Sequence, residues 1–413
     1  MPWGEQTAVF SADLGGRHPG ARINRGWLFA VIAGLLLGLA PAAWSQEVKP
    51  ILLGATVSLE GKYREPSLMI KDVLNLWETQ VNQRGGLLGR PVKLVLYDDR
   101  SKEELVRRFY QQMVQEDRVD LTFSPYSSEL TLAASEITER HQKIMMAATA
   151  SAEIVWQRDY KYIFGVIAPA GRYMIGFLDL MARHGLESAA ILHDRSPFNA
   201  SAALGAKDWA SRFGIKISYM QAYSQEEKDL PKILTQALAT RPQGLILCAY
   251  PEDCYKFLKL LQTAESRPPA LCLTVGPALP AFYQIAGSAA EEVFGPSHWE
   301  PDTRVPFPGN REFVESFQNL TRRPPSYHAG AVFAACQVLE RAITQTASLD
   351  PEKLRNYILS LDTVTVIGRF RLDASGMQIG HNPMLIQWQN GKKEIVYPAN
   401  MQTAPARFSP TRR

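Results

Sequence analysis

Paired cysteines, clustered histidines and an excess of one charge are all missing from this sequence of 413 residues. The formal net charge is only +4, and no Lys/Arg cluster indicates a nucleic-acid surface. Cys248, Cys254, Cys272 and Cys336 include no Cys-x-x-Cys pair, so the common zinc motifs are excluded. We predict no metal site, no cofactor and no nucleic-acid partner. For the first three cysteines, buried free thiols and one disulfide both remain open.

Motifs of common hydrolases and nucleotide-binding enzymes are also missing. The chain lacks Gly-x-Ser-x-Gly, His-Glu-x-x-His and the phosphate-binding Gly-x-x-x-x-Gly-Lys. His193 and Asp194 are neighbours on a predicted strand, so their side chains point to opposite faces and do not form a catalytic pair. We therefore predict that the protein is not an enzyme.

The sequence has one long hydrophobic run, near the N-terminus. Residues 27–40 follow two arginines and are almost continuously apolar, but the run is shorter than a membrane-spanning helix requires. Pro41 and the small residues up to Ser45 are typical of a signal-peptidase site, so we predict that residues 1–45 are a cleaved export signal. An uncleaved anchor is the alternative. No cysteine follows the run to accept a lipid, and the mature protein is predicted not to span the membrane.

The sequence contains instead a regular alternation of strand and helix patterns. With 46% hydrophobic and 21% charged residues, the composition is that of a globular chain long enough for two domains. Strand patterns at residues 51–57, 92–97, 120–123 and 144–146 alternate with helical patterns at 68–81, 102–115 and 129–141. Right-handed crossovers convert such a series into a parallel sheet covered on both faces, so we predict an α/β fold.

The same alternation restarts after a connection at residues 162–170. Strand patterns at 188–193, 215–218, 244–249 and 270–275 alternate with helical patterns at 172–184, 200–213, 229–239 and 256–263. The later helices and short strands, from residue 311 to residue 396, include too few strands for a third unit. They are predicted to return to the two halves, with a hairpin around Asn390 and Gly391.

Small and hydroxyl-bearing residues follow two successive strands of the first series. Ser127 and Ser128 come after one strand, and Ala147, Ala148 and Thr149 come at the end of the next. An open α/β sheet places its ligand crevice at these strand ends. The hydroxyls and nearby backbone N–H groups can hold a small anion such as a carboxylate. The alternative is that the Ser and Thr side chains cap the helices that follow.

The order and spacing of several segments resemble the type I periplasmic solute-binding proteins of branched-chain amino-acid transporters, the leucine/isoleucine/valine-binding group. These segments are GATVSLEG at residues 54–61, VNQRGGLLGRP at 81–91, LVLYDD at 94–99, the Ser127-Ser128 turn, AAT at 147–149 and GRFRLD at 368–373. They span nearly the whole predicted mature chain. The resemblance implies a periplasmic protein with two Rossmann-like lobes, each with a parallel sheet, joined by three crossings.

The lobe boundaries are also expectations from this resemblance. The crossings are placed near Ile167, Phe294 and Gly368. Residues 46–167 and 295–367 would then form lobe 1, residues 168–294 and 368–398 would form lobe 2, and residues 399–413 would form a C-terminal tail.

A ligand site in the cleft between the lobes is implied as well. Ser128 and Thr149, with the backbone around Ala147, would hold the carboxylate of an amino acid. An aromatic side chain of lobe 2 would cover the ligand, and Phe198 and Tyr250 lie at the matching strand ends. Ordinary packing in the core or in a loop is the alternative for both aromatic residues.

Two departures from the family leave the class of ligand open. Where the family has a carboxylate for the ammonium group of the ligand, after the strand at 271–275, this chain has Gly-Pro. A buried unpaired ammonium group is costly, so either Glu252 or Asp253 replaces that carboxylate or the ligand has no amine. Pro66 stands where the family has an aromatic residue beside the ligand, and we predict Tyr63 as its replacement.

These features favour a binding protein that delivers a small amino acid or carboxylic acid to the permease subunits of an ABC transporter. The alternative is a soluble ligand-sensing protein that docks on a signalling receptor or kinase. Ligand binding alone does not separate the two. Loss of uptake on deletion of the gene would indicate transport, and loss of a signalling response would indicate sensing.

Overall fold

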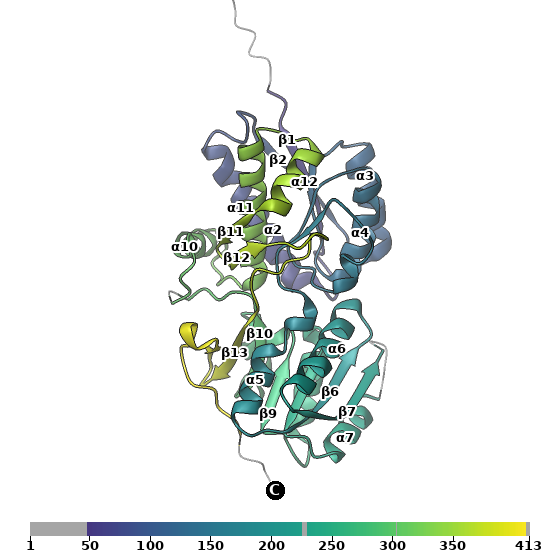
Figure 1. Ribbon diagram of the computed structural model, residues 1–413, viewed down its shortest axis with the longest axis vertical. Helices are drawn as coiled ribbons and strands as arrows, with labels where there is room; N and C mark the ends of the chain where they lie inside the picture. Colours follow the sequence, from purple (N-terminus) through teal and green to yellow (C-terminus); the bar gives the residue numbers. More distant parts are fainter. Residues whose placement is uncertain (1–47, 225–228, 303, 410–413) are drawn as a thin grey trace, which may run out of the picture. The chain divides into compact units, whose positions relative to one another are not determined.

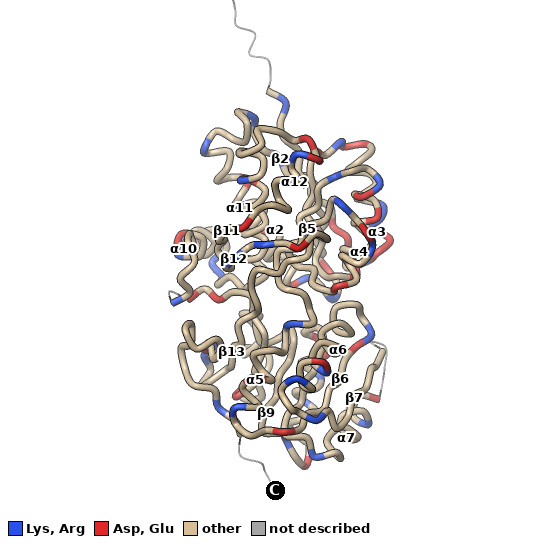
Figure 2. The backbone as a smooth tube through the Cα atoms, viewed as in Figure 1, with Lys and Arg blue, Asp and Glu red and all other residues tan. Residues whose placement is uncertain are grey.

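The computed structural model describes residues 48–224, 229–302 and 304–409 (Figure 1). Strands and helices alternate along most of this chain, and the strands form two large sheets. The predicted export signal lies outside the described residues. Among the helices of these three segments, none has the length and apolar character needed to cross a membrane. Figure 2 shows Lys and Arg interspersed with Asp and Glu along the described chain, in keeping with the small net charge of +4.

The first sheet is entirely parallel and has the strand order β2-β1-β3-β4-β5. Its strands are β1 (Ile51–Val57), β2 (Val92–Asp98), β3 (Leu121–Phe123), β4 (Met145–Ala147) and β5 (Ile163–Gly165). The helices between the first four strands are α2 (Arg64–Gln83), α3 (Glu103–Gln115) and α4 (Ser128–Arg140). In Figure 1, α3 and α4 lie on the opposite side of this sheet from α2. This arrangement confirms the predicted α/β fold.

The second sheet has seven strands in the order β14-β13-β10-β9-β8-β6-β7. Five of them run parallel: β6 (Ser188–Asp194), β7 (Lys216–Tyr223), β8 (Gly244–Cys248), β9 (Ala270–Leu273) and β10 (Val293–Ser297). The helices of this half are α5 (Ile175–Arg183), α6 (Pro197–Arg212), α7 (Leu230–Ala239), α8 (Pro251–Gln262) and the short α9 (Phe282–Ala286). Every residue of β8, β9 and β10 is buried, as expected for parallel strands that are covered on both faces.

The strand order reverses at a corresponding place in each sheet. β1 lies between β2 and β3, and β6 lies between β7 and β8. In a doubly wound sheet, ligands bind beyond the carboxyl ends of the strands at such a switch point. Each half therefore offers one binding edge, built from the turns that follow its central strands.

The chain passes between the sheets three times, after β5, after β10 and between β12 and β13. The elements from the second to the third passage are α10 (Asn310–Thr321), α11 (Tyr327–Thr346), α12 (Pro351–Ser360), β11 (Asp362–Thr365) and β12 (Gly368–Arg371). α11 packs on α2, and β11 pairs with β12 in a small antiparallel sheet. Gly368, where we expected the last crossing, begins β12, and the passage to the second sheet follows that strand.

The last two strands, β13 (Met384–Gln389) and β14 (Lys392–Tyr397), form an antiparallel hairpin on the edge of the second sheet. The connecting residues Asn390 and Gly391 both have positive φ, 54° and 72°. A two-residue turn of type I′ requires this, and Asn and Gly tolerate it. The predicted hairpin is therefore confirmed.

A close contact between two glycines joins the first crossing to the second half. η2 (Ala170–Arg172) packs on α6, and a Cβ atom on Gly205 of α6 would lie 2.2 Å from the Cα atom of Gly171. Backbone atoms on both sides make this contact, so a side chain cannot avoid it by rotating. Glycine at position 205 holds α6 against the crossing.

We predict that Gly205→Ala lowers the free energy of unfolding. In an unobstructed helix the same change stabilises by about 0.5–1 kcal/mol. Here the added methyl group overlaps backbone, and overpacking of this kind costs about 1–3 kcal/mol. Denaturant unfolding measures the sign. Leu204→Ala, at an exposed position of the same helix, is the control with little effect, and stabilisation by Gly205→Ala would contradict the close contact.

Candidate functional site

Ser127 occupies the turn between β3 and α4 in an unusual backbone conformation. Its Oγ atom accepts a hydrogen bond from the backbone N–H of Leu130 at 3.2 Å, so it caps α4. Its φ and ψ angles are 78° and 151°, a region that residues other than glycine rarely adopt. Ser127 therefore caps α4, as the alternative interpretation proposed. Its strained backbone is a second feature of the same turn.

Ser128 connects two turns rather than capping a helix. Its Oγ atom accepts hydrogen bonds from the backbone N–H groups of Ser151 at 3.2 Å and Ala152 at 3.0 Å. The turn after β3 is thereby tied to the turn after β4. Because a serine hydroxyl has one proton of its own, Ser128 keeps an O–H donor for a further acceptor.

Thr149 and its two alanine neighbours make different contributions. Ala147 and Ala148 are buried, and backbone hydrogen bonds engage the carbonyl of Ala147 with Val166 and the N–H of Ala148 with Met146. The Oγ1 atom of Thr149 is buried and has no hydrogen-bond partner among the described residues. An unsatisfied buried hydroxyl costs free energy, so this atom needs a separate explanation.

The two aromatic residues proposed from the second half lie at corresponding strand ends. Phe198 is in the first turn of α6, which follows β6, and Tyr250 directly precedes α8, which follows β8. Both are almost completely buried, with 6% and 5% exposure. The switch point of the second sheet therefore carries aromatic rings where that of the first sheet carries hydroxyls.

A cavity brings residues of both halves together. Its lining residues are Tyr126, Ser127, Ser128, Thr149, Ser151, Tyr173, Phe198, Tyr250, Val275 and Tyr327. The cavity volume is about 10 Å³, which is enough for roughly one water molecule. A larger cavity of about 180 Å³ lies elsewhere, lined by residues such as Trp156, Phe164 and Arg355. Of these two cavities, the smaller one joins the binding edges of the two sheets, so it is the candidate site.

Aromatic contacts fill most of this site. Phe198 packs edge-on against Tyr173 with ring centroids 5.2 Å apart, and Tyr250 lies 6.0 Å from Phe198 and 6.4 Å from Tyr126. Tyr126 comes from the first sheet and Tyr250 from the second, so one ring contact spans the two halves. Any ligand of several non-hydrogen atoms must separate these rings.

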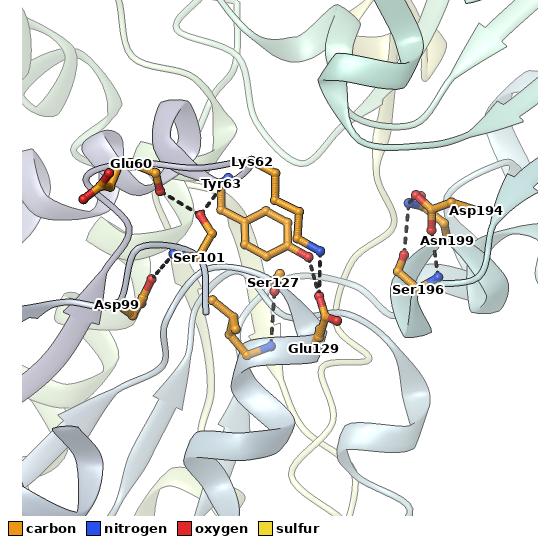
Figure 3. A network of polar contacts seen from close by, with 11 residues as sticks. Glu60, Lys62, Tyr63, Asp99, Ser101, Ser127, Glu129, Asp194, Ser196 and Asn199 are labelled. Carbon is orange, nitrogen blue, oxygen red and sulfur yellow. Dashed lines mark hydrogen bonds and ion pairs between the residues drawn. The ribbon is translucent and has the colours of Figure 1, made fainter. Parts of the chain in front are cut away.

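Tyr63 lies beside the cavity without lining it. Its ring centroid is 5.0 Å from that of Tyr250 and 5.4 Å from that of Tyr126. Its hydroxyl donates to Glu129 at 2.7 Å, and Lys62 forms an ion pair with the same carboxylate at 3.1 Å (Figure 3). Burial, and next the charge of Glu129, raise the pKa of Tyr63, which therefore remains a protonated donor.

A buried carboxylate supports the loop that carries Tyr63. Asp99 accepts hydrogen bonds from Thr56 at 2.7 Å, from Ser58 at 2.5 Å and from the backbone of Ser101 at 2.9 Å. The Oγ atom of Ser101 in turn accepts from the backbone of Tyr63 at 3.1 Å, as Figure 3 shows. Burial raises the pKa of Asp99, and the hydrogen bonds from Ser58 and Thr56 oppose that shift. This network fixes the position of the Tyr63 ring.

Glu252, the residue proposed to hold an ammonium group, lies outside the cavity. It belongs to the first turn of α8, its side chain is 71% exposed, and it pairs with Lys256 at 2.9 Å. Asp253 is more buried, but its carboxylate also bonds Lys256, at 3.0 Å. The structure thus brings Ser127, Ser128, Thr149, Phe198 and Tyr250 together, and places Glu252 and Asp253 apart from them.

Several residues of the cavity carried no prediction from the sequence. Tyr126, Ser151 and Val275 continue strand-end turns that the pattern did identify, so a wider window around those turns would have included them. Tyr173 follows η2 of the first crossing, and Tyr327 begins α11. No local pattern marks them, because their position depends on how the two halves meet.

The tyrosines of the cavity lining and two histidines behind them are neutral near pH 7. Burial raises the pKa of four tyrosines of the lining, Tyr126, Tyr173, Tyr250 and Tyr327. Behind them lie His298, 4.9 Å from the Tyr173 ring, and His328, stacked on Tyr327 at 3.9 Å. Burial lowers the pKa of both histidines, to about 3 for His328. The cavity therefore offers neutral donors and apolar rings.

All four cysteines of the chain are buried free thiols. Cys248 and Cys272 lie on β8 and β9, Cys254 on α8 and Cys336 on α11. Burial raises the pKa of each thiol, which keeps it protonated and unreactive.

Comparison with known proteins gives a consistent picture. A profile of the family described as periplasmic binding protein matches residues 50–393. The leucine-specific-binding protein of Salmonella typhimurium is 23% identical over 374 residues, covering 87% of this chain and 95% of that protein. A leucine binding protein from Thermotoga maritima has a TM-score of 0.75 at 17% identity, covering 84% of this chain and 97% of that one.

A second solved structure of the same fold was determined with a bound ligand. The solute binding protein of an ABC transporter from R. palustris, in complex with benzoate, has a TM-score of 0.72 at 17% identity. The match covers 84% of this chain and 96% of that one. At such low identity, the structural comparisons establish the fold, and they confirm the predicted two-lobed α/β architecture.

We predict opposite effects from two substitutions at Ser127. Ser127→Ala removes the cap and keeps the strained backbone, so it lowers the free energy of unfolding by about 1 kcal/mol. Ser127→Gly relieves a strain of about 1–3 kcal/mol and loses only a few tenths as a cap, so its stability equals or exceeds that of the wild type. Chemical denaturation of both proteins measures the order. Equal losses in both would show that the positive φ stores no strain.

Proposed function

This chain belongs to the periplasmic binding protein family, and from that premise we propose that it captures a small amino acid or carboxylic acid in the interlobe cavity and delivers it to an ABC permease. Members of this family bind solutes and are not enzymes, in agreement with the prediction that this protein is not an enzyme. Export to the periplasm by the predicted signal is part of the same proposal.

The observation that carries the proposal is the unpartnered Oγ1 atom of Thr149. It is a buried hydroxyl, and it lines a cavity formed at the switch points of both sheets. Beside it, Ser128 is fixed by two backbone donors and keeps its own O–H proton for a further acceptor. A carboxylate accepts both protons, and the N-terminus of the 13-residue α4 favours its negative charge.

Entry of a ligand requires the lobes to separate. The cavity of about 10 Å³ is far smaller than any amino acid, and rings from both halves enclose it. In the proposed cycle, the lobes open about the three crossings, the ligand binds the hydroxyls of lobe 1, and closure adds the rings of lobe 2. The proposed lobe boundaries are those expected from the sequence, except that the last crossing follows β12 instead of lying at Gly368.

We predict that Ser128→Ala and Thr149→Val each weaken ligand binding. Hydrogen bonds to charged groups contribute about 1.5–3 kcal/mol, so the dissociation constant should rise roughly 10- to 150-fold. A thermal-shift screen of amino acids and carboxylic acids first identifies the ligand, since a compound at about 100 times its Kd stabilises by about 2.7 kcal/mol. Calorimetry on the variants then measures the loss.

Thr138→Val is the matched control for these variants. It also removes a buried hydroxyl, but from the far end of α4, about 15 Å along the helix from Ser128. It should lower stability slightly and leave affinity unchanged. Unchanged affinity in both site variants would show that the hydroxyls of Ser128 and Thr149 have a purely structural role.

We also predict that the radius of gyration in solution falls when the protein is saturated with the compound that stabilises it most. Binding groups come from both lobes, so closure completes the ligand contacts. Small-angle X-ray scattering measures the change, and a compound without thermal effect serves as the control. Identical profiles with and without the stabilising compound would contradict the hinge.

A further inference from the structure

The composition of the cavity walls narrows the class of ligand. One part of the lining consists of hydroxyls, from Ser127, Ser128, Thr149 and Ser151. The remaining lining residues are aromatic, except for one valine. A site that combines a few convergent donors with aromatic walls suits a ligand with one anionic end and an apolar body.

Acidic side chains near this cavity are engaged with other groups. Glu129 holds Lys62 at 3.1 Å and the hydroxyl of Tyr63 at 2.7 Å. Asp194, from the second sheet, accepts hydrogen bonds from the backbone of Ser196 and the side chain of Asn199, each at 2.8 Å (Figure 3). An ammonium group in the cavity would have to compete with these partners.

Glu65 requires separate consideration, because it is half-buried in the first turn of α2. Its charge contributes to the raised pKa of Tyr126, so it lies within electrostatic range of the cavity wall. Burial raises the pKa of Glu65 itself, and the charge of Arg323 opposes this shift. Glu65 is therefore the carboxylate to test if an amine does bind.

The geometry of the rings favours a flat ligand body. The ring centroids of Tyr173 and Phe198 are 5.2 Å apart, with an interplanar angle of 67°. Those of Phe198 and Tyr250 are 6.0 Å apart, with an interplanar angle of 43°. Rings in tilted and edge-to-face arrangements present both faces and edges to a neighbour. A planar ring inserted among them can make the same kinds of contact that it displaces.

We propose, on the basis of the function inferred above, that the ligand is a monocarboxylic acid with an aromatic body and no ammonium group. Its carboxylate accepts hydrogen bonds from Ser128 and Thr149 on lobe 1. Its ring packs against Phe198 and Tyr250 on lobe 2. Amino acids of the same skeleton bind more weakly, because their ammonium group enters a cavity walled by neutral side chains.

Calorimetry on the purified exported protein with matched acids tests this class. The first pair is 3-phenylpropanoate and phenylalanine, and the second is 4-methylpentanoate and leucine. Benzoate and cyclohexanecarboxylate compare a flat ring with a puckered ring of similar size. We expect the amine-free acid to bind at least tenfold more tightly in each pair, and benzoate to bind more tightly than its saturated counterpart.

The outcomes separate this inference from the proposed function. Tighter binding of phenylalanine or leucine overturns the inference and leaves a solute-binding protein, and loss of that binding in Glu65→Gln would then identify the ammonium partner. Equal binding of benzoate and cyclohexanecarboxylate overturns the aromatic part. Failure of all six compounds, and of every compound in the thermal screen, would defeat the proposed function as well.

A variant and a pH series provide independent readouts. Phe198→Leu should weaken benzoate at least tenfold and 4-methylpentanoate less, while the unfolding temperature without ligand monitors the fold. In Glu65→Gln, which removes the half-buried carboxylate near the cavity whose pKa is raised, benzoate affinity should be constant from about pH 7 to pH 9. In that range the cavity tyrosines, with raised pKa values, and His298, His328 and His381, with lowered ones, stay neutral. Equal weakening of both acids by Phe198→Leu, or a pH-dependent benzoate affinity of Glu65→Gln, contradicts the proposed contacts.

Discussion

The direction of the parallel strands is the constraint on which the rest of this structure depends. Parallel neighbours need crossover connections, so β1 to β5 all end at one edge of the first sheet and β6 to β10 at one edge of the second, and the turns that follow these strands lie there. The strand order reverses at β1 in the first sheet and at β6 in the second, which opens a crevice at that edge. Ser128, Thr149, Phe198 and Tyr250 are far apart in the sequence, and they share one cavity because each follows a strand.

At this edge, hydroxyls rather than cations are placed to meet an anion. A lysine or arginine would give a stronger attraction, but it would have to be desolvated whenever the lobes closed without ligand. Ser128 and Thr149 are neutral, so closure without ligand leaves no buried charge at this edge and costs the unsatisfied hydroxyls of Thr149 and Tyr250. The strained backbone of Ser127 belongs to the same turn, and strain of this kind persists only where surrounding contacts enforce it. Those contacts include the bonds from Ser128 to the next turn.

The sequence was sufficient for features that depend on local patterns. Strand β1 coincides with the predicted segment, the hairpin at Asn390 and Gly391 was specified by its turn residues, and the hydroxyls after β3 and β4 were found from composition. It was insufficient where distant segments meet. Tyr173 enters the cavity from the first crossing and Tyr327 from the start of α11. Glu252 lies outside the cavity because α8 begins at Pro251, earlier than its helical pattern suggested. Packing between the lobes decides which face of the first turn of a helix points into the cleft.

The crossings themselves form part of the cavity wall, and this connects binding to closure. Tyr173 follows η2 of the first crossing, and η2 is held against α6 by the contact between Gly171 and Gly205. The same helix α6 carries Phe198 at its start, so a movement at the crossing displaces a ring that would contact the ligand. His298 follows β10 at the second crossing and packs on Tyr173 and Tyr327. The ring contacts that close the cavity without ligand are replaced when a ligand enters, so affinity measures only the difference between the two sets of contacts. A ligand that restores aromatic packing while satisfying Thr149 therefore gains more from closure than one that merely fills the space.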